Sequence, residues 1–325
     1  MYDLISIYNL ISDKILKFLE NNNVIYDVNS ETRKINNVKN KEKEKCFLRF
    51  KALLKYIDRT LNRVPRKVIF SKHLKNKFNN YLSQELIDCI NFFKSKFENG
   101  EEINFNLSRK VFGDCFEDWL FNIWNIRHLH LNDKIINDCE NMKNNRSDYL
   151  LFFIINNLKC YFIDVIKHPR GYNFTSTDFL KILDEENWIS IIGLTEIDGI
   201  PVCEDELGNL NECRLENNQD IYALTKNGIN TPIYINGKYF FQNGINSFGE
   251  KEKYIRITNL ILNTIVKLNK NYIQNLVSID LEISNSNILI IFKHDFYKKT
   301  VLSITKNLDV FVILERYNGL EILNL

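Results

Sequence analysis

The chain has few of the residues that interrupt or cross-link a fold. Only 4 prolines and 11 glycines occur in 325 residues, and no Cys-x-x-Cys pair is present. The 7 cysteines are scattered, and several stand inside apolar runs. An odd number of scattered cysteines argues against a disulfide framework or a zinc ribbon and favours reduced, buried thiols. We therefore expect a cytoplasmic protein.

Long apolar runs are also missing. No stretch approaches the roughly 20 apolar residues that a membrane-spanning helix requires. The segment Met1-Tyr2-Asp3-Leu4 carries no basic charge, which argues against a signal peptide. A membrane is therefore not an expected partner.

A strong net charge is absent as well. The formal net charge is +2 at pH 7, so the molecule has no global field that would attract nucleic acid. Any surface that binds nucleic acid must then be local. There is no internal repeat and no low-complexity linker, so we expect the parts of the chain to pack against one another.

Hydrophobic periodicity predicts an α+β protein. Residues 1–105 show helical spacing, which predicts a mainly helical N-terminal region. Residues 106–195 predict a central α+β core, a small antiparallel sheet with flanking helices that would hold the active site. Residues 196–325 predict a C-terminal region of hairpin, helix and antiparallel sheet. Its hairpin turns at Asn236-Gly237, the pair preferred in type I′ turns. The run from Trp188 to Leu194 reads as a short buried strand.

The residues best suited to catalysis or ligand binding lie between Trp124 and Arg170. Two apolar runs, Tyr149–Ile155 and Cys160–Ile166, are separated by Asn156-Asn157, which predicts strand, turn and strand. The preceding segment, residues 126–131, alternates apolar and polar residues. In a strand, His128 and His130 would share one face, and Arg127 would lie on the other. The basic residues of this stretch singled out for chemistry are Arg127, His128, His130, Arg146, Lys167, His168 and Arg170.

These residue types suit metal-independent cleavage of RNA. A base removes the ribose 2′-OH proton, cations stabilise the charged transition state, and an acid protonates the leaving 5′-oxygen. Histidine serves as acid and base because its pKa lies near neutrality, and arginine holds phosphate through two hydrogen bonds. The catalytic candidates are His128 or His130 as the base and His168 as the acid. The candidates for phosphate binding are Arg127, Arg146, Lys167 and Arg170.

The order of these elements resembles a known group of toxins. A helix, a short strand with Arg or His, the strands R-x-x-x-L-L-F and Y-F-I-D-V-I-K-H, and a cationic turn follow one another within residues 108–190. This order resembles the RelE/ParE-like toxins and the wider colicin/barnase-type bacterial ribonucleases. Arg146 and the end Lys167-His168-Pro169-Arg170 carry the resemblance. It implies an endoribonuclease of a toxin or defence system, although those toxins are small single domains. The additional regions would then serve recognition, regulation or self-inhibition.

Two alternatives remain open from the sequence. His128, His130 and His168 could ligate a metal ion in a metal-dependent hydrolase, because two histidines at i and i+2 on a strand share a face. The chain could also be a non-enzymatic binding or accessory protein of a bacterial defence or phage-related system, with its cationic residues on a partner surface. Under the ribonuclease hypothesis we expect no cofactor, RNA as the substrate and a protein partner or inhibitor. The sequence does not specify the oligomeric state.

Overall fold

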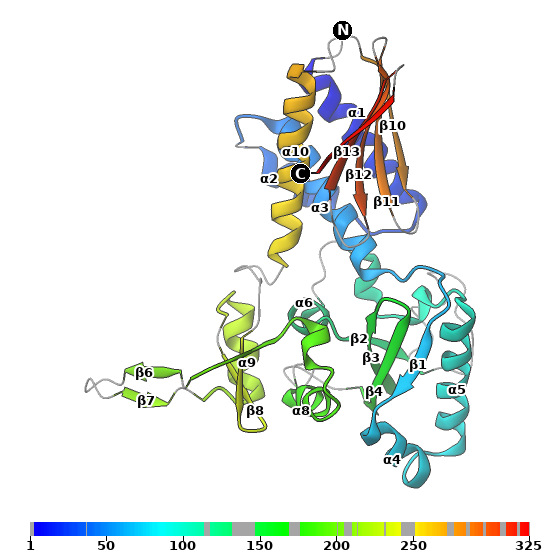
Figure 1. Cartoon of the computed structure of the whole chain (residues 1–325), viewed down its shortest axis with the longest axis vertical. Helices are drawn as coiled ribbons and strands as arrows, with labels where there is room; N and C mark the ends of the chain where they lie inside the picture. Colours follow the sequence, from blue (N-terminus) through cyan, green and yellow to red (C-terminus); the bar gives the residue numbers. More distant parts are fainter. Residues whose placement is uncertain are drawn as a thin grey trace. The chain divides into compact units, whose positions relative to one another are not determined.

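The computed structural model separates into two units by internal packing (Figure 1). The terminal unit comprises Met1–Asn62, Phe112–Phe116 and Lys253–Leu325, and the central unit comprises Arg63–Val111 and Glu117–Glu252. The structure describes residues 3–36, 38–113, 118–131, 147–168, 176–199, 201–204, 210–212, 214–230, 232–241, 251–271, 276–283, 287–294, 297–305, 310–316 and 319–324.

The terminal unit packs helices from both ends of the chain against a C-terminal sheet. Its helices are α1 (Leu4–Asn21), α2 (Val28–Ile35), α3 (Lys41–Arg59) and α10 (Glu252–Asn271). Helices α2 and α3 are separate, and the Asn40 side chain caps the start of α3. Apolar faces of α1, α3 and α10 form one core with alternate residues of the sheet, including Ile290 and Leu302.

The sheet of the terminal unit is an antiparallel meander. Its strands follow the chain in the order β10 (Leu276–Ile283), β11 (Asn287–His294), β12 (Tyr297–Thr305), β13 (Val310–Arg316) and β14 (Gly319–Asn324). Each strand pairs with the next in the antiparallel sense. The predicted antiparallel sheet at the end of the fold is confirmed.

Charged side chains connect the helices of the terminal unit. The Arg49 guanidinium donates two hydrogen bonds to the Glu31 carboxylate, at 3.0 and 3.1 Å, and a third of 2.9 Å to Asp13. Arg49 and Glu31 are both buried. Since a buried ion pair is stable only when its remaining hydrogen bonds are made, this network fixes how α1, α2 and α3 pack.

The central unit is organised on a four-stranded mixed sheet in the order β1-β4-β3-β2. Strand β2 (Arg127–His130) pairs antiparallel with β3 (Tyr149–Asn156), and β3 pairs antiparallel with β4 (Lys159–Lys167). Strand β1 (Lys67–Phe70) joins β4 in the parallel sense. Strand β1 falls within the region expected to be mainly helical, so the sequence pattern did not reveal it.

Helices flank this sheet. Helix α4 (Lys72–Asn80) follows β1, and α5 (Gln84–Asn99) places Phe97 against Phe153 and Phe162. Helix α6 (Trp119–Trp124) leads into β2, and α8 (Thr177–Glu185) places Phe179 against Phe152. The three-residue turn Asn104–Asn106 and the turn Arg109–Phe112 are 3-10 helices. The sheet therefore has an α5 side and an α8 side.

Smaller elements complete the central unit. Strands β5 (Thr195–Ile197), β9 (Lys238–Phe241) and β8 (Ile233–Ile235) form one sheet, and β6 (Val202–Glu204) pairs with β7 (Leu210–Glu212). Helix α9 spans Asn218–Lys226. Asn236 and Gly237 between β8 and β9 have φ of 49° and 85°, the two positive values of a type I′ turn, which confirms the predicted hairpin.

One predicted strand is wrong. The segment expected to be a strand between Trp188 and Leu194 contains a 3-10 helix, Ile189–Ile192. Gly193 ends it in the left-handed region, with φ of 83°. An apolar run this short does not distinguish a strand from a helical turn, because both can bury it.

The α+β fold class is confirmed, with a helical N-terminal part, a small central sheet and a C-terminal sheet preceded by a hairpin and a helix. The expected boundaries near residues 105 and 195 do not coincide with the two packed units, because the first and last parts of the chain share one core. None of the described helices has the length and apolar character needed to cross a membrane.

Candidate functional site

The local fold around β2 aligns two histidines. Helix α6 ends at Asn125, which adopts the left-handed conformation with φ of 54°, and the chain then enters β2. His128 pairs with Phe152 of β3, and His130 pairs with Leu150. Because side chains alternate along a strand, both imidazoles lie on the side of Phe152, the α8 side of the sheet.

The three candidate histidines form a row. The ring centres of His128 and His130 are 6.2 Å apart, and those of His130 and His168 are 5.8 Å apart. His168 directly follows β4, and its backbone N–H donates to the carbonyl of Asp148 at 2.7 Å, which anchors the end of the strand beside β3. We call His128, His130 and His168 the histidine row.

Exposure increases along the row. His128 is buried, with only 6% of its surface exposed, His130 is half-buried, and His168 is exposed. The ring of His128 lies 5.7 Å from Phe152, which in turn packs 4.4 Å from Phe179 of α8, both distances between ring centres. The row therefore runs from the apolar core to the surface.

The middle imidazole of the row is held neutral. Burial and, to a lesser extent, the neighbouring charges of His128 and His168 together lower the pKa of His130 to about 4, against a backbone hydrogen bond at Ser147 that raises it. His130 is consequently neutral at pH 7. Its Nδ1 is buried and has no hydrogen-bond partner within the described residues. A neutral imidazole is the form that accepts a proton.

A carboxylate lies at the buried end of the row. Asp118 Oδ2 is 3.9 Å from His128 Nδ1, and both side chains are almost completely buried. No sequence motif marks Asp118 as a functional residue. Its place before α6 carries the signal of a helix cap, and nothing in the sequence indicates that the chain returns beside it as β2.

Not all of the candidate phosphate-binding residues lie near the histidine row. Arg127 precedes His128 on the strand and so points to the α5 side, with its guanidinium 4.3 Å above the Phe121 ring. On that side burial raises the pKa of the Cys160 thiol, while the charges of Arg66 and Arg127 act to lower it.

Of the remaining candidate cations, only Lys167 lies within the described residues. Lys167 is exposed and directly precedes His168. Arg146 and Arg170 lie outside the described residues. The structure thus groups the three histidines and places Lys167 next to the row in the chain, whereas Arg127 points away from it.

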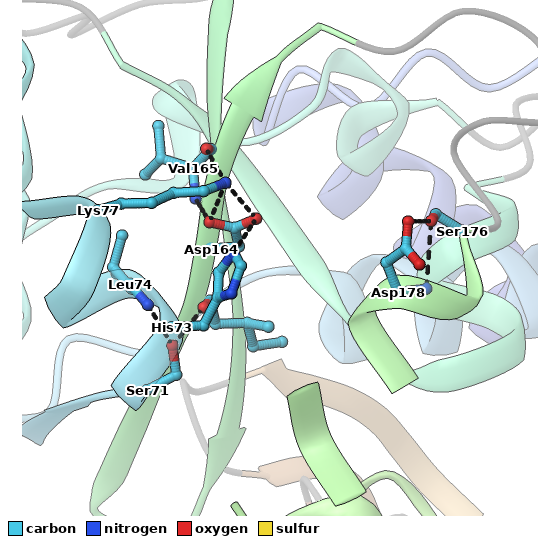
Figure 2. Close-up of polar contacts among 9 residues, drawn as sticks. Ser71, His73, Leu74, Lys77, Asp164, Val165, Ser176 and Asp178 are labelled. Atoms are coloured by element: carbon cyan, nitrogen blue, oxygen red, sulfur yellow. Dashed lines mark hydrogen bonds and ion pairs between the residues drawn. The ribbon is translucent and has the colours of Figure 1, made fainter. Parts of the chain in front are cut away.

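A second polar cluster, not anticipated from the sequence, joins α4 to the edge of β4 (Figure 2). The Lys77 ammonium lies 2.8 Å from the Asp164 carboxylate, and His73 Nε2 lies 3.5 Å from it. Asp164 is 5% exposed, and the backbone N–H of Val165 also donates to it at 2.8 Å. We call His73, Lys77 and Asp164 the α4 clasp.

The clasp lies beside the part of β4 that follows Phe162, where β1 has ended and no longer pairs with β4. Ser71 caps α4 and its hydroxyl also donates to the carbonyl of Ile163 at 2.6 Å, while Lys77 Nζ reaches the carbonyl of Val165 at 3.3 Å. These bonds satisfy strand carbonyls that β1 does not reach, because buried backbone acceptors need partners. The geometry gives the clasp a structural role.

Within the residues that the structure describes, no group of three His, Cys, Asp or Glu side chains is arranged to hold a metal ion. Comparison of the chain with protein-family models, curated proteins and solved structures found no match. Assignment of a function consequently rests on the chemistry of the site.

Proposed function

We propose that this protein is a metal-independent ribonuclease, a bacterial toxin or defence effector acting on RNA in the cytoplasm. The observation that carries the proposal is the histidine row, in which imidazoles from two separated segments meet and run to the surface. Adjacent imidazoles can supply both the base and the acid that cleavage at a ribose 2′-OH requires.

The arrangement favours His130 as the base. Its depressed pKa leaves it neutral at pH 7, so it is ready to accept the 2′-OH proton. A pKa near 4 makes an isolated imidazole a weak base, but a bound phosphodiester brings a negative charge that offsets the repulsion from the neighbouring rings. Substrate binding would therefore raise the basicity of His130 where the reaction needs it.

His168 is assigned the acid. It is the exposed member of the row and lies beside His130, so its protonated form can donate to the leaving 5′-oxygen. Attack of the 2′-oxygen on phosphorus forms a 2′,3′-cyclic phosphate, while the 5′-oxygen departs with the proton from the acid. Lys167 is assigned to phosphate, as are Arg146 and Arg170 from the sequence resemblance. His128 is too deeply buried to meet substrate.

A second candidate is a non-enzymatic accessory protein that binds a partner protein. The burial of His128 against Phe152 favours it, because an imidazole packed on an aromatic ring can be part of the core alone. Under this proposal the exposed cations of the central unit would face an acidic partner, and removing His130 would leave the cellular effect of the protein unchanged.

Expression in a bacterium separates the two candidates. Wild type, His130→Gln, His168→Gln and the matched control His73→Gln would be induced to equal levels, followed by growth curves and total RNA integrity. The ribonuclease proposal expects growth arrest and RNA loss with wild type and His73→Gln, and neither with the two row variants. Equal, harmless expression of all four proteins would remove the ribonuclease proposal.

A further inference from the structure

We propose that Asp118 acts on the histidine row through its carboxylate, which favours the protonated form of His128. The catalytic importance of this pair rests on the proposed ribonuclease function, whereas the pair itself rests on the geometry of the central unit. Neither residue is expected to touch RNA.

The position of Asp118 is fixed by the helix that it begins. Its Oδ1 accepts a hydrogen bond of 3.2 Å from the N–H of Phe121, and its carbonyl accepts one of 2.8 Å from the N–H of Asn122. These two bonds hold the backbone and one carboxylate oxygen. The other oxygen, Oδ2, is the one that lies 3.9 Å from His128 Nδ1.

Asp118 brings a negative charge beside His128. From β3 the ring meets Phe152, which is apolar, and on its own strand it meets His130. The end of β4 contributes His168, which lies beside His130. A carboxylate at about 4 Å favours the protonated imidazole, and burial strengthens that attraction because few water molecules screen it.

The consequence is an ordered distribution of protons along the row. A charge on His128 is stabilised by Asp118, and it opposes a second charge on His130. Without the Asp118 carboxylate, the protonated form of His128 is less favoured, and its charge opposes protonation of His130 less.

The test substitutes Asp118→Asn, which removes the charge but keeps an amide oxygen to cap α6, since Asn and Asp are comparable N-caps. Asp27→Asn is the matched control, because Asp27 caps α2 in the terminal unit through the N–H of Ser30. The five histidines are followed by NMR in full-length protein labelled at the imidazoles, with signals assigned from single His→Gln variants. Asp118→Glu tests whether a restored charge rescues the effect.

We expect Asp118→Asn to move the titration midpoint of His128 to lower pH by about one unit, with no change in Asp27→Asn and at least partial return in Asp118→Glu. A His128 titration identical in wild type and Asp118→Asn would overturn the proposal. The RNA-cleavage pH profile is measured in parallel, and a fall in kcat larger than any rise in KM is expected. If wild type cleaves no RNA while the His128 midpoint still moves, the ribonuclease proposal falls and the pairing stands.

Discussion

The rings of His130 and His168 lie 5.8 Å apart although their strands are not neighbours in the sheet. Strand β3 separates β2 from β4, and two strand spacings amount to about 9.5 Å. The two imidazoles therefore lean toward each other across β3. This approach of two segments distant in the sequence makes the row a site rather than a set of isolated polar residues.

Removing His168 should change the protonation of His130. Because the charge of His168 is one of the causes that lower the pKa of His130, His168→Gln should raise that pKa above about 4. The change should be modest, since burial is the larger cause and remains. NMR titration of the His130 imidazole measures it, with His73→Gln as the control. An unchanged His130 titration would mean that the two rings do not interact.

The same depressed pKa predicts a loss of stability in acid. His130 binds fewer protons when folded than when unfolded between its folded pKa of about 4 and its ordinary value of 6.5. The unfolded state is thus favoured as pH falls through that window, by at most about 3 kcal/mol. Urea unfolding at pH 7 and pH 4.5 tests this. His130→Gln should lose less stability over the interval than wild type, and equal losses would contradict the lowered pKa.

Several elements could be predicted from the sequence because their signals are local. The Asn236-Gly237 turn and the alternating runs after Val277 specify their own conformations. The alternation at β2 was also sufficient to place His128 and His130 on one face.

Other features depend on contacts that no short window contains. Strand β1 has only four residues and exists because it pairs with β4 far along the chain. The α4 clasp joins Lys77 to Asp164, and the buried end of the row joins Asp118 to His128 after the chain turns at Asn125. None of these pairings leaves a periodic signal, since each is set by tertiary packing.

The α4 clasp should contribute to the stability of the central unit. Lys77→Met leaves the buried carboxylate of Asp164 with the weaker His73 contact and one backbone N–H, at an expected cost of about 3 kcal/mol. Lys75→Met, at an exposed position of the same helix, should change stability by less than about 0.5 kcal/mol. Hydrogen exchange in α4 and urea unfolding measure both. Equal stability of the two variants would show that the clasp is not energetically important.

The buried network of the terminal unit should be more costly to break. Arg49→Met leaves Glu31 buried without its two guanidinium bonds, and we expect a loss of about 3–5 kcal/mol. The exposed pair of Lys94 and Glu98 provides the comparison, because Lys94→Met should cost at most about 0.5 kcal/mol. Thermal unfolding of both variants checks the difference, and a loss below about 1 kcal/mol for Arg49→Met would contradict the account of this network.

The most direct test of the histidine row is RNA cleavage by purified full-length protein in the presence of EDTA, with product ends identified by mass spectrometry. The account predicts that wild type and His73→Gln yield 2′,3′-cyclic phosphate ends, and that His130→Gln and His168→Gln are slower by at least about 100-fold. Cleavage that is equal in all four proteins, that requires added metal, or that is absent from wild type would contradict it.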